Sequence, residues 1–578
     1  MLNKKKIKKL IEIILIFIIV CCCVMLFPQT RKLFINIVEK VLERELNHDI
    51  WMKIIFKYLL YVICFFCFML IFLFDSPLFI KYIKFGLDKY GEKILIFSSI
   101  GIIALSVIVR IIMYLKCRSL WGDEAEFAAN IISRNWFELL VPPLDYNQSA
   151  PVFYVVIEKI IGSLFGYSIY SLRLFSFLAF IGLLICETIF IKKAFNSNSY
   201  QVAFVVVMNA LLPSYIWYSN ELKPYMSDVF FVILIILLYF LYTNKKINLI
   251  TLVILCILFL GFSTPVIFFT GGILLSEFLI AIFNNNRKNI LCVIISGIVV
   301  IIIFSIYYYW WFSPISEFMN IWWTRWHNQR GNIIEIKELF TGFGNSSSEY
   351  VWVFVPIAIL GIYSLVVYKN KIAYMIALSL FLAFLASLIG KYPLANRLWL
   401  FIPAIVFILT PIGFEYINNK IKFKVNKLVF FLNIILTIYL LINCLTYTGN
   451  KMYMFGGDIN PLILYVQKNI KEGEKLYVHK FKRAQVHFII GYSSKKIGNV
   501  KEDNIIYEIF AVEDFNENGF EKDLSEIIKN KKVYLITHGR MKNTMDILQN
   551  YGIITEVMNV DGNPLYFFEL DECKDKEY

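Results

Sequence analysis

The sequence predicts a polytopic α-helical membrane protein that ends in a soluble α/β domain. Hydrophobic residues make up 59% of its 578 residues, and the mean hydropathy is +0.65. A soluble protein of this size seldom reaches such values. Apolar runs of about twenty residues recur along the chain, which is the length that a helix needs to cross a bilayer. Short apolar runs bounded by polar residues follow near the C-terminus, where they indicate strands.

The apolar runs predict about thirteen membrane-spanning helices. We place them at residues 9–27, 52–74, 94–115, 171–191, 201–217, 226–242, 248–263, 265–283, 290–310, 351–368, 372–390, 398–416 and 428–447. Basic loops such as "KKKIKK", "TNKKIN" and "NNKIKFKVNK" then all fall on one side, which the positive-inside rule identifies as the cytoplasm. The N-terminus is therefore expected inside and the C-terminal domain outside. We interpret the net charge of +14 as a topology signal, because no basic stripe interleaved with aromatic residues indicates nucleic acid.

Residues 116–170 form the first long outer loop in this topology. A further span at 150–166 would reverse every later basic loop. It would also bury Glu158 and Lys159 in mid-bilayer, where each costs about 2.5–3.5 kcal/mol. An amphipathic helix that lies in the membrane interface costs less. We therefore expect two interfacial helices in this loop, joined by "VPPLDYNQS".

The two ends of the chain differ from its middle. The N-terminal apolar run is long for a signal peptide and lacks a small-x-small cleavage site, so we expect a retained signal-anchor helix. From about residue 455 onward, short apolar runs such as "KLYVHK" and "KVYLITH" alternate with amphipathic stretches, and no Gly-rich phosphate loop is present. Most of the eleven cysteines lie inside apolar runs, which indicates packing roles and no disulfide framework.

The stretch "WGDEAEF" holds three carboxylates at the edge of an apolar run. One interpretation is structural: Asp123 caps an interfacial helix, with Glu126 three residues later, and the helix dipole favours both acids. The other is chemical: a carboxylate at the membrane surface takes a proton from an acceptor hydroxyl or amine, or helps to hold a divalent cation. The spacing alone favours the structural interpretation.

Three further polar clusters fall on the same outer face. The segment "YSNELKPYMSD" carries Glu221 and Lys223, which alone indicate a solvated turn. In "KYPLANRLWLFIP", Arg397 enters the outer end of an apolar span, where it either snorkels or grips a phosphate. The loop "WWFSPISEFMNIWWTRWHNQRGN" sets Arg325 and His327 among tryptophans that suit lipid headgroups or a sugar face. Cations and paired acids on one face suit an anionic lipid-linked substrate.

Taken in order, these motifs resemble those of membrane glycosyltransferases of the C-type fold that use lipid-linked sugars. The resemblance is closest to family 39, which includes protein O-mannosyltransferases and lipid A aminoarabinose transferases. It rests on "WGDEAEFAANI", "QSAPVFYVVIEKIIGSLFGYSIYSLRLFSFLAF", "WYSNELKPYMSDVF" and "YPLANRLWLFIP", and covers about residues 93–415. It implies a C-type membrane domain over 93–450. Residues 1–92, with two additional N-terminal helices and a linker, fall outside the resemblance, and the change in composition predicts an extracytoplasmic α/β domain over 451–578.

The resemblance also implies a polyprenyl-phosphate-sugar donor and an active site at the outer membrane surface. Asp123 matches the first-loop aspartate of the family, the proposed catalytic base, and Glu124 follows it as in the family. Arg397 matches the arginine of the late "YP…R" motif, which implies a phosphate ligand. Lys223 stands where many members have arginine in an "E-x-R-P-Y"-like motif. Before Pro151, where some members carry an acid or a base, this chain reads "QSA".

We expect an inverting transfer in which Asp123 deprotonates the acceptor while Arg397 and Lys223 hold the departing phosphate. A divalent cation such as Mg²⁺, Mn²⁺ or Zn²⁺ is a candidate cofactor, with Asp123 and Glu126 as candidate ligands. The supporting acids are Glu124, Glu126 and Glu221. The candidate substrate contacts are Tyr225, Tyr392, Arg325 and His327. The other expected partners are an extracytoplasmic acceptor and membrane lipids.

Two other functions use the same features. A flippase or transporter for a lipid-linked glycan would use the same cations for the lipid phosphate, but it needs polar residues along a path through the bilayer, and the middle spans carry few. A non-catalytic membrane scaffold would bind no donor. The acceptor can be a lipid, a protein or a cell-envelope glycan. Richness in Lys, Ile and Asn is typical of an AT-rich bacterial genome, and hence indicates the plasma membrane.

Overall fold

The computed structural model describes most of the chain between residue 92 and residue 571. The chain divides into two compact units, residues 1–95 and 96–578, and the described part lies almost wholly in the second. The predicted spans at 9–27, 52–74 and 428–447 lie outside the described residues. The described ranges are 92–116, 119–195, 199–319, 351–368, 370–389, 391–392, 397–421, 459–471, 473–478, 505–507, 524–536, 547–560 and 563–571.

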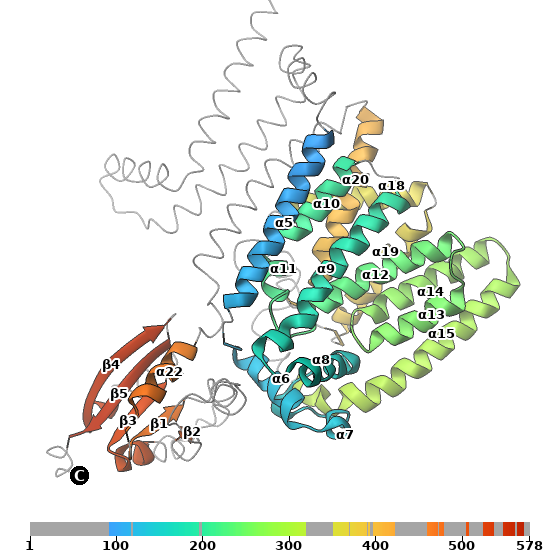
Figure 1. The fold of residues 1–578 in the computed structure, drawn as a ribbon. Coiled ribbons are helices and arrows are strands. Elements are labelled where there is room, and N and C mark those ends of the chain that lie inside the picture. Colours follow the sequence, from blue (N-terminus) through green and yellow to red (C-terminus); the bar gives the residue numbers. More distant parts are fainter. Residues whose placement is uncertain are drawn as a thin grey trace, which may run out of the picture. The chain divides into compact units, whose positions relative to one another are not determined.

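Most of the described residues form helices, many of which run side by side in a bundle (Figure 1). The helices before residue 220 are α5 (Glu92–Lys116), α6 (Gly122–Ser133), α7 (Trp136–Leu139), α8 (Val152–Phe165), α9 (Ile169–Ala194), α10 (Ser199–Leu211) and α11 (Pro213–Tyr218). The later ones are α12 (Tyr225–Thr243), α13 (Leu249–Leu260), α14 (Val266–Phe283), α15 (Arg287–Tyr307), α18 (Val351–Val367), α19 (Lys371–Leu388), α20 (Phe401–Ile421) and α22 (Asn460–Asn469).

Several of these helices are apolar enough to cross a membrane. Within the described residues, five are also long enough: α9, α12, α14, α19 and the continuous helical stretch that begins with α15. Shorter apolar stretches lie in α5, α10, α13, α18 and α20. The predicted spans between 94 and 416 therefore fall on helices. The segment "GFSTP", Gly261 to Pro265, separates α13 from α14, so the chain forms two helices here and not one.

The predicted span 201–217 is wrong in one respect, because it is two helices. Helix α10 ends at Leu211, and α11 begins at Pro213 after the extended residue Leu212. Proline has no backbone N–H and its ring clashes with the preceding turn, so it favours a break in a helix and is well tolerated as the first residue of the next one. The break places the six-residue helix α11 directly before the segment that carries Glu221 and Lys223.

The long outer loop folds into α6, α7 and α8, which lie at one end of the bundle (Figure 1). Helix α8 has 14 residues and buries both charged residues that made a span costly. The Lys159 ammonium donates to the carbonyls of Ile131 at 2.6 Å and Arg134 at 2.8 Å, at the end of α6, where free carbonyls favour a cation. Burial raises the pKa of Glu158 well above its usual range.

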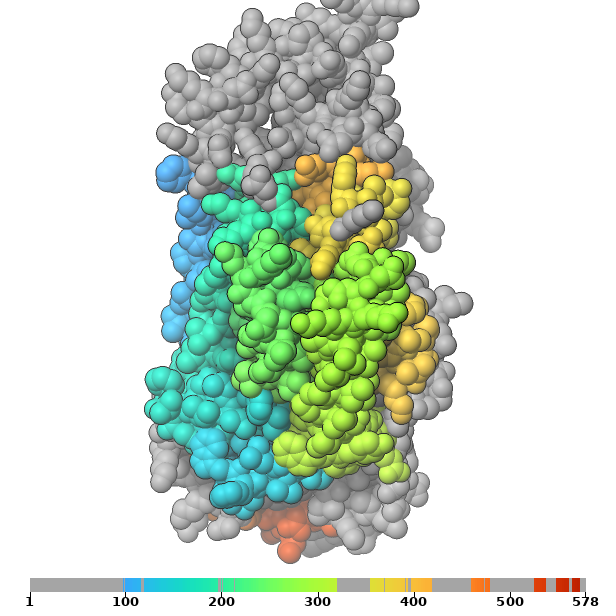
Figure 2. Space-filling view, turned by 90° about the vertical axis from the view of Figure 1, so that its right-hand side faces the viewer, coloured from blue at the N-terminus to red at the C-terminus, as the bar shows by residue number. Residues whose placement is uncertain are grey.

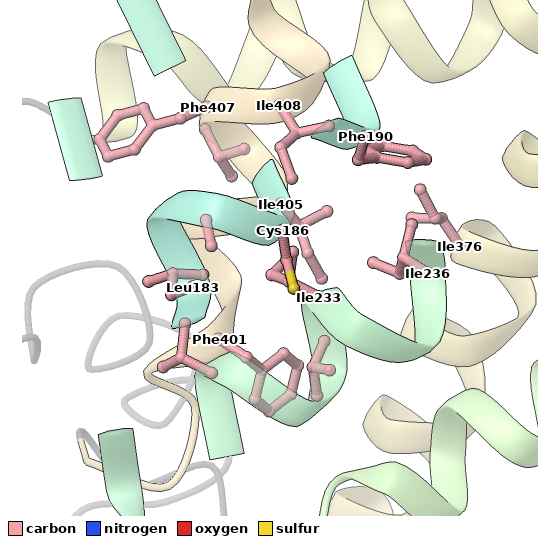
Figure 3. Packing of buried hydrophobic residues seen from close by; sticks show 14 of the residues in the cluster. Leu183, Cys186, Phe190, Ile233, Ile236, Ile376, Phe401, Ile405, Phe407 and Ile408 are labelled. Carbon is pink, nitrogen blue, oxygen red and sulfur yellow. The ribbon is translucent and has the colours of Figure 1, made fainter. Parts of the chain in front are cut away.

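The bundle is held by an apolar core that joins helices far apart in the sequence. Side chains of α9, α12, α19 and α20 meet there, among them Leu183, Ile233, Ile376 and Ile405 (Figure 3). Figure 2 looks onto the side of the bundle formed by α13, α14 and α15. On α15 the apolar side chains point outward, with Ile301 65% exposed, as expected for a helix surface that lies against lipid.

The C-terminal part contains a five-stranded sheet with the order β2-β1-β3-β5-β4. Strands β1, β2 and β3 are parallel to one another, whereas β5 runs antiparallel to both β3 and β4. Helix α22 packs Leu462 and Val466 against one face, where Leu476 and Ile536 lie. The strands are β1 (Lys475–Val478), β2 (Ile505–Tyr507), β3 (Lys532–Ile536), β4 (Gly552–Val560) and β5 (Asn563–Leu570). Strands β1 and β3 lie in the runs "KLYVHK" and "KVYLITH", from which strands are predicted.

Helices α18 and α20 approach each other through two glycines. A Cβ atom on Gly413 would collide with the carbonyl oxygen of Ile357, and one on Gly361 with the carbonyl oxygen of Leu409. Small residues let membrane helices pack with their backbones close together. We therefore expect Gly413→Ala to push α18 and α20 apart and to lower the free energy of unfolding by about 1–3 kcal/mol.

Thermal unfolding of the protein in detergent checks this prediction. Gly297→Ala on α15 is the matched control, because nothing lies within 4 Å of its added Cβ atom. Equal unfolding midpoints for the two variants would contradict the close packing of α18 on α20.

Candidate active site

Asp123 and Arg397 form an ion pair across 274 residues of sequence. The Nη1 atom of Arg397 donates to Oδ2 of Asp123 at 3.3 Å. The two side chains are 34% and 35% exposed, so a ligand can reach both. The guanidinium of Arg397 also lies over the rings of Tyr225 at 5.3 Å and Trp121 at 5.9 Å. The structure thus joins the first-loop acid to the late arginine.

Asp123 does not cap helix α6. The helix begins one residue earlier, at Gly122, with Trp121 as its N-cap residue. The third helical residue is therefore Glu124, whose Oε2 accepts from the backbone N–H of Trp121 at 3.3 Å. The predicted capping pair of Asp123 and Glu126 is wrong, because the N-cap and the third helical residue each lie two positions earlier, at Trp121 and Glu124. Asp123 lies in the first turn, where the helix dipole favours a negative charge.

Glu124 forms a buried fork that joins three segments. Its Oε1 accepts from Nε of Arg173 at 2.9 Å, and its Oε2 accepts from Nη2 at 2.7 Å. The backbone N–H of Leu222 also donates to Oε1, at 2.8 Å. Both ionised side chains are almost fully buried. Glu124 therefore ties α6 to the start of α9 and to the segment before α12.

Glu126, Gln148 and Lys223 form a chain of hydrogen bonds beside the ion pair. The amide nitrogen of Gln148 donates to Oε2 of Glu126 at 2.7 Å, and its oxygen accepts from Nζ of Lys223 at 2.6 Å. Burial raises the pKa of Glu126 to about 7, and the nearby Asp123 carboxylate adds to this effect. Burial lowers the pKa of Lys223, although the Asp123 carboxylate opposes that shift.

Three other candidate residues lie around this centre. Oε2 of Glu221 accepts from the indole N–H of Trp217 at 2.6 Å, so a side chain of α11 orients this acid. Tyr225 opens α12 beside Arg397. Tyr392 is buried and donates to the carbonyl of Leu398 at 2.8 Å, which secures the turn that carries Arg397.

The remaining candidates, Arg325 and His327, lie outside the described residues.

Sequence reasoning missed the partners that hold the candidates. Arg173 carries the fork with Glu124, and Gln148 joins Glu126 to Lys223. A charged residue in an apolar helix indicates a buried partner, because an unpaired charge there is costly. Arg173, near the start of α9, is such a residue. Gln148 gives no such indication, because an isolated amide in a loop is ordinary.

The residues fit a bound metal ion poorly. Among the described residues, no group of three His, Cys, Asp or Glu side chains gathers as metal ligands do. Asp123 is paired with Arg397, and Glu126 is bonded to Gln148, which holds Lys223. Two cations beside two acids suit an anionic ligand better than a cation. We derive no chemical step through a metal.

Comparison with known proteins identifies the fold. No family model matches the chain, and no curated protein matches it. Crystal structures of ArnT from Cupriavidus metallidurans do match: the one bound to undecaprenyl phosphate has a TM-score of 0.52 at 11% identity, and the apo one has 0.50 at 12%. Each match covers 81% of this chain and 97% of ArnT. The chain shares the fold of ArnT. At this identity, the likeness to ArnT is one of fold.

The fork predicts a large effect of neutralising Glu124. Glu124→Gln keeps the shape of the side chain but leaves the buried Arg173 without its anionic partner. We expect the free energy of unfolding to fall by about 3–5 kcal/mol, measured by thermal or denaturant unfolding in detergent.

The control is Asp145→Asn, which breaks the pair of Arg134 with an acid that is 57% exposed. A surface pair contributes about 0–1 kcal/mol. Equal losses for Glu124→Gln and Asp145→Asn would contradict the structural role of the fork.

The environment of Glu126 predicts a pH dependence of stability. Its folded-state pKa of about 7 lies above the ordinary glutamate value of 4.5, so the folded protein holds this proton more tightly than the unfolded chain. The stabilising contribution is complete below about pH 4.5 and is lost as the pH rises through about 7. We expect the stability of the wild type, relative to that of Glu126→Gln, to fall over this window.

Unfolding midpoints of both proteins, measured from pH 4.5 to pH 8, check the prediction. A constant difference between the two proteins over the whole range would contradict the raised pKa of Glu126.

Proposed function

We propose that the protein is an integral membrane glycosyltransferase that transfers a sugar from a polyprenyl-phosphate donor to an extracytoplasmic acceptor. The observation that carries the proposal is the partly exposed ion pair of Asp123 and Arg397, with Lys223 near both, in a chain with the ArnT fold. A carboxylate beside two cations suits a reaction in which a proton leaves one reactant and an anion leaves the other. The ArnT that this fold resembles was crystallised with undecaprenyl phosphate, which supports a lipid phosphate as ligand.

The proposed reaction is a single displacement with inversion. The acceptor oxygen or nitrogen forms a bond to the anomeric carbon while the bond from that carbon to the phosphate oxygen breaks. The polyprenyl phosphate leaves with the electron pair. Asp123 takes the proton of the acceptor, and Arg397 and Lys223 offset the charge that grows on the phosphate.

The ion pair also suggests an order of events. Before the donor binds, Arg397 is held by the carboxylate of Asp123. A phosphate would compete for the same guanidinium, because bidentate arginine–phosphate contacts are strong. Donor binding would then draw Arg397 from Asp123 and leave the carboxylate free to accept a proton. The proposed donor thus switches on the proposed base.

We place the proposed reaction at the outer surface of the membrane. The basic loops support a cytoplasmic N-terminus and an active site on the outer surface of the plasma membrane. We further propose that the protein belongs to family 39 and that its membrane domain extends from residue 93 to residue 450. The C-terminal α/β domain would then lie outside, where it can bind the acceptor or cover the site.

The test is Asp123→Asn, expressed in a strain that lacks the wild-type gene. We expect transfer to fall by about 10²–10⁴-fold, because the acceptor loses its base, while donor binding remains. Turnover is measured as the release of polyprenyl phosphate from a polyprenyl-phosphate sugar in membranes. Mass spectrometry of surface glycans and lipids then identifies the missing product.

Asp145→Asn is the matched control, since this acid lies in the same loop and is directed to Arg134. Undiminished transfer by Asp123→Asn would rule out Asp123 as the base. Lipid-linked sugar that moves across vesicle membranes without transfer would instead support a flippase. A wild type that binds no donor would support a scaffold.

A further inference from the structure

Arg110 lies inside the apolar stretch of α5 and is fully buried. Its Nη1 donates to the carbonyl of Ala210 at 2.8 Å and to that of Ser106, one turn earlier in α5, at 3.1 Å. Its Nε donates to the hydroxyl of Ser219 at 3.2 Å. The guanidinium also lies 3.6 Å from the ring centre of Phe180 on α9. One side chain thus contacts α5, α9 and the residues on both sides of α11.

The two longer-range acceptors of Arg110 lie on either side of α11. Ala210 belongs to the last turn of α10, whose carbonyls lose their helical donors where Pro213 interrupts the chain. Ser219 is the residue that ends α11. Arg110 therefore satisfies a carbonyl before α11 and a hydroxyl after it, and it fixes the position of this short helix along the bundle.

Helix α11 in turn contacts both halves of the candidate site. Its Trp217 donates to Glu221, two residues before Lys223. The hydroxyl of Tyr215 donates to the carbonyl of Leu400 at 2.9 Å and accepts from the backbone N–H of Ala404 at 3.1 Å. Leu400 is three residues from Arg397. A shift of α11 would therefore move the Lys223 segment and the Arg397 turn together.

A buried cation in an apolar helix is costly, and its persistence points to a role. Packing alone would favour an apolar side chain of similar volume at this place. Arginine differs from lysine because its planar fork has five N–H donors in fixed directions. Arg110 uses that geometry, since Nε and Nη1 reach different segments at once.

We infer that Arg110 is a positioning residue for the proposed transfer, acting through α11 to hold the two cations that bind the donor phosphate. This inference rests on the proposed function for its effect on turnover, but its structural part does not. Arg110 acts through α11 and takes no part in the bond changes.

The first arm of the test measures hydrogen exchange of backbone amides and needs no activity. Ser219→Ala removes one acceptor of Arg110, together with the bonds of the same hydroxyl to the carbonyl of Ile216 and the side-chain amide of Asn220. Ser106→Ala is the matched control, because Ser106 is an equally buried serine whose hydroxyl donates only within α5, to Ile103. We expect exchange in residues 219–223 to rise about five- to tenfold in Ser219→Ala and to stay unchanged in Ser106→Ala.

The second arm measures turnover per donor-binding molecule. In Ser219→Ala and Arg110→Lys we expect turnover to fall by about tenfold or more, with little change in donor affinity, because a small misplacement of the cations weakens contacts made in the transition state. Because unfolded protein binds no donor, it is left out of the count. The turnover of a poorly folding variant can therefore still be compared with that of the wild type.

Equal exchange in Ser219→Ala and Ser106→Ala, or unchanged turnover per donor-binding molecule in Arg110→Lys, would overturn the inference and leave Arg110 as a general stability residue. If the wild type transfers no sugar, the proposed function fails, and the exchange comparison alone then decides whether Arg110 holds α11.

Discussion

The buried ion pair of Glu124 and Arg173 is the constraint on which the candidate site depends. It fixes the first turn of α6 against the start of α9 and, through the N–H of Leu222, against the segment before α12. Asp123 precedes Glu124 in the chain, and Lys223 follows Leu222. The separation between the proposed base and one of the proposed phosphate ligands is therefore set by residues that cannot touch the substrate.

The charged residues that hold the site together are buried, whereas those proposed to react are partly exposed to solvent. Glu124, Arg173, Arg110 and Lys159 are nearly or fully buried, and each makes several directed hydrogen bonds. A buried charge without such contacts would cost several kcal/mol. The Asp123–Arg397 pair is about one-third exposed, so its partners can be exchanged for a ligand at a smaller cost. The same residue types thus serve two purposes, according to their access to solvent.

Local patterns in the sequence predicted local structure well. Apolar runs marked the helices between 94 and 416, and the segment with Glu158 and Lys159, for which an interfacial helix is predicted, forms the 14-residue helix α8. The true start of α6 escaped prediction, because a tryptophan N-cap is unusual. The break at Pro213 and the contacts of Gln148 escaped too. Hydrogen bonds between residues tens to hundreds of positions apart leave no periodic trace, so the candidates could be ranked but their partners could not be named.

The ion pair of Asp123 and Arg397 has a consequence for biosynthesis. Its members are separated by 274 residues, and most of the bundle lies between them in the chain. At a synthesis rate of about 5–20 residues per second, roughly 15–55 seconds pass between the emergence of the acid and that of the arginine. During that interval the first outer loop is already inserted without its cation. A chain that ends before Arg397 therefore carries only the acidic member of the pair, and the pair forms only after most of the bundle has been synthesised.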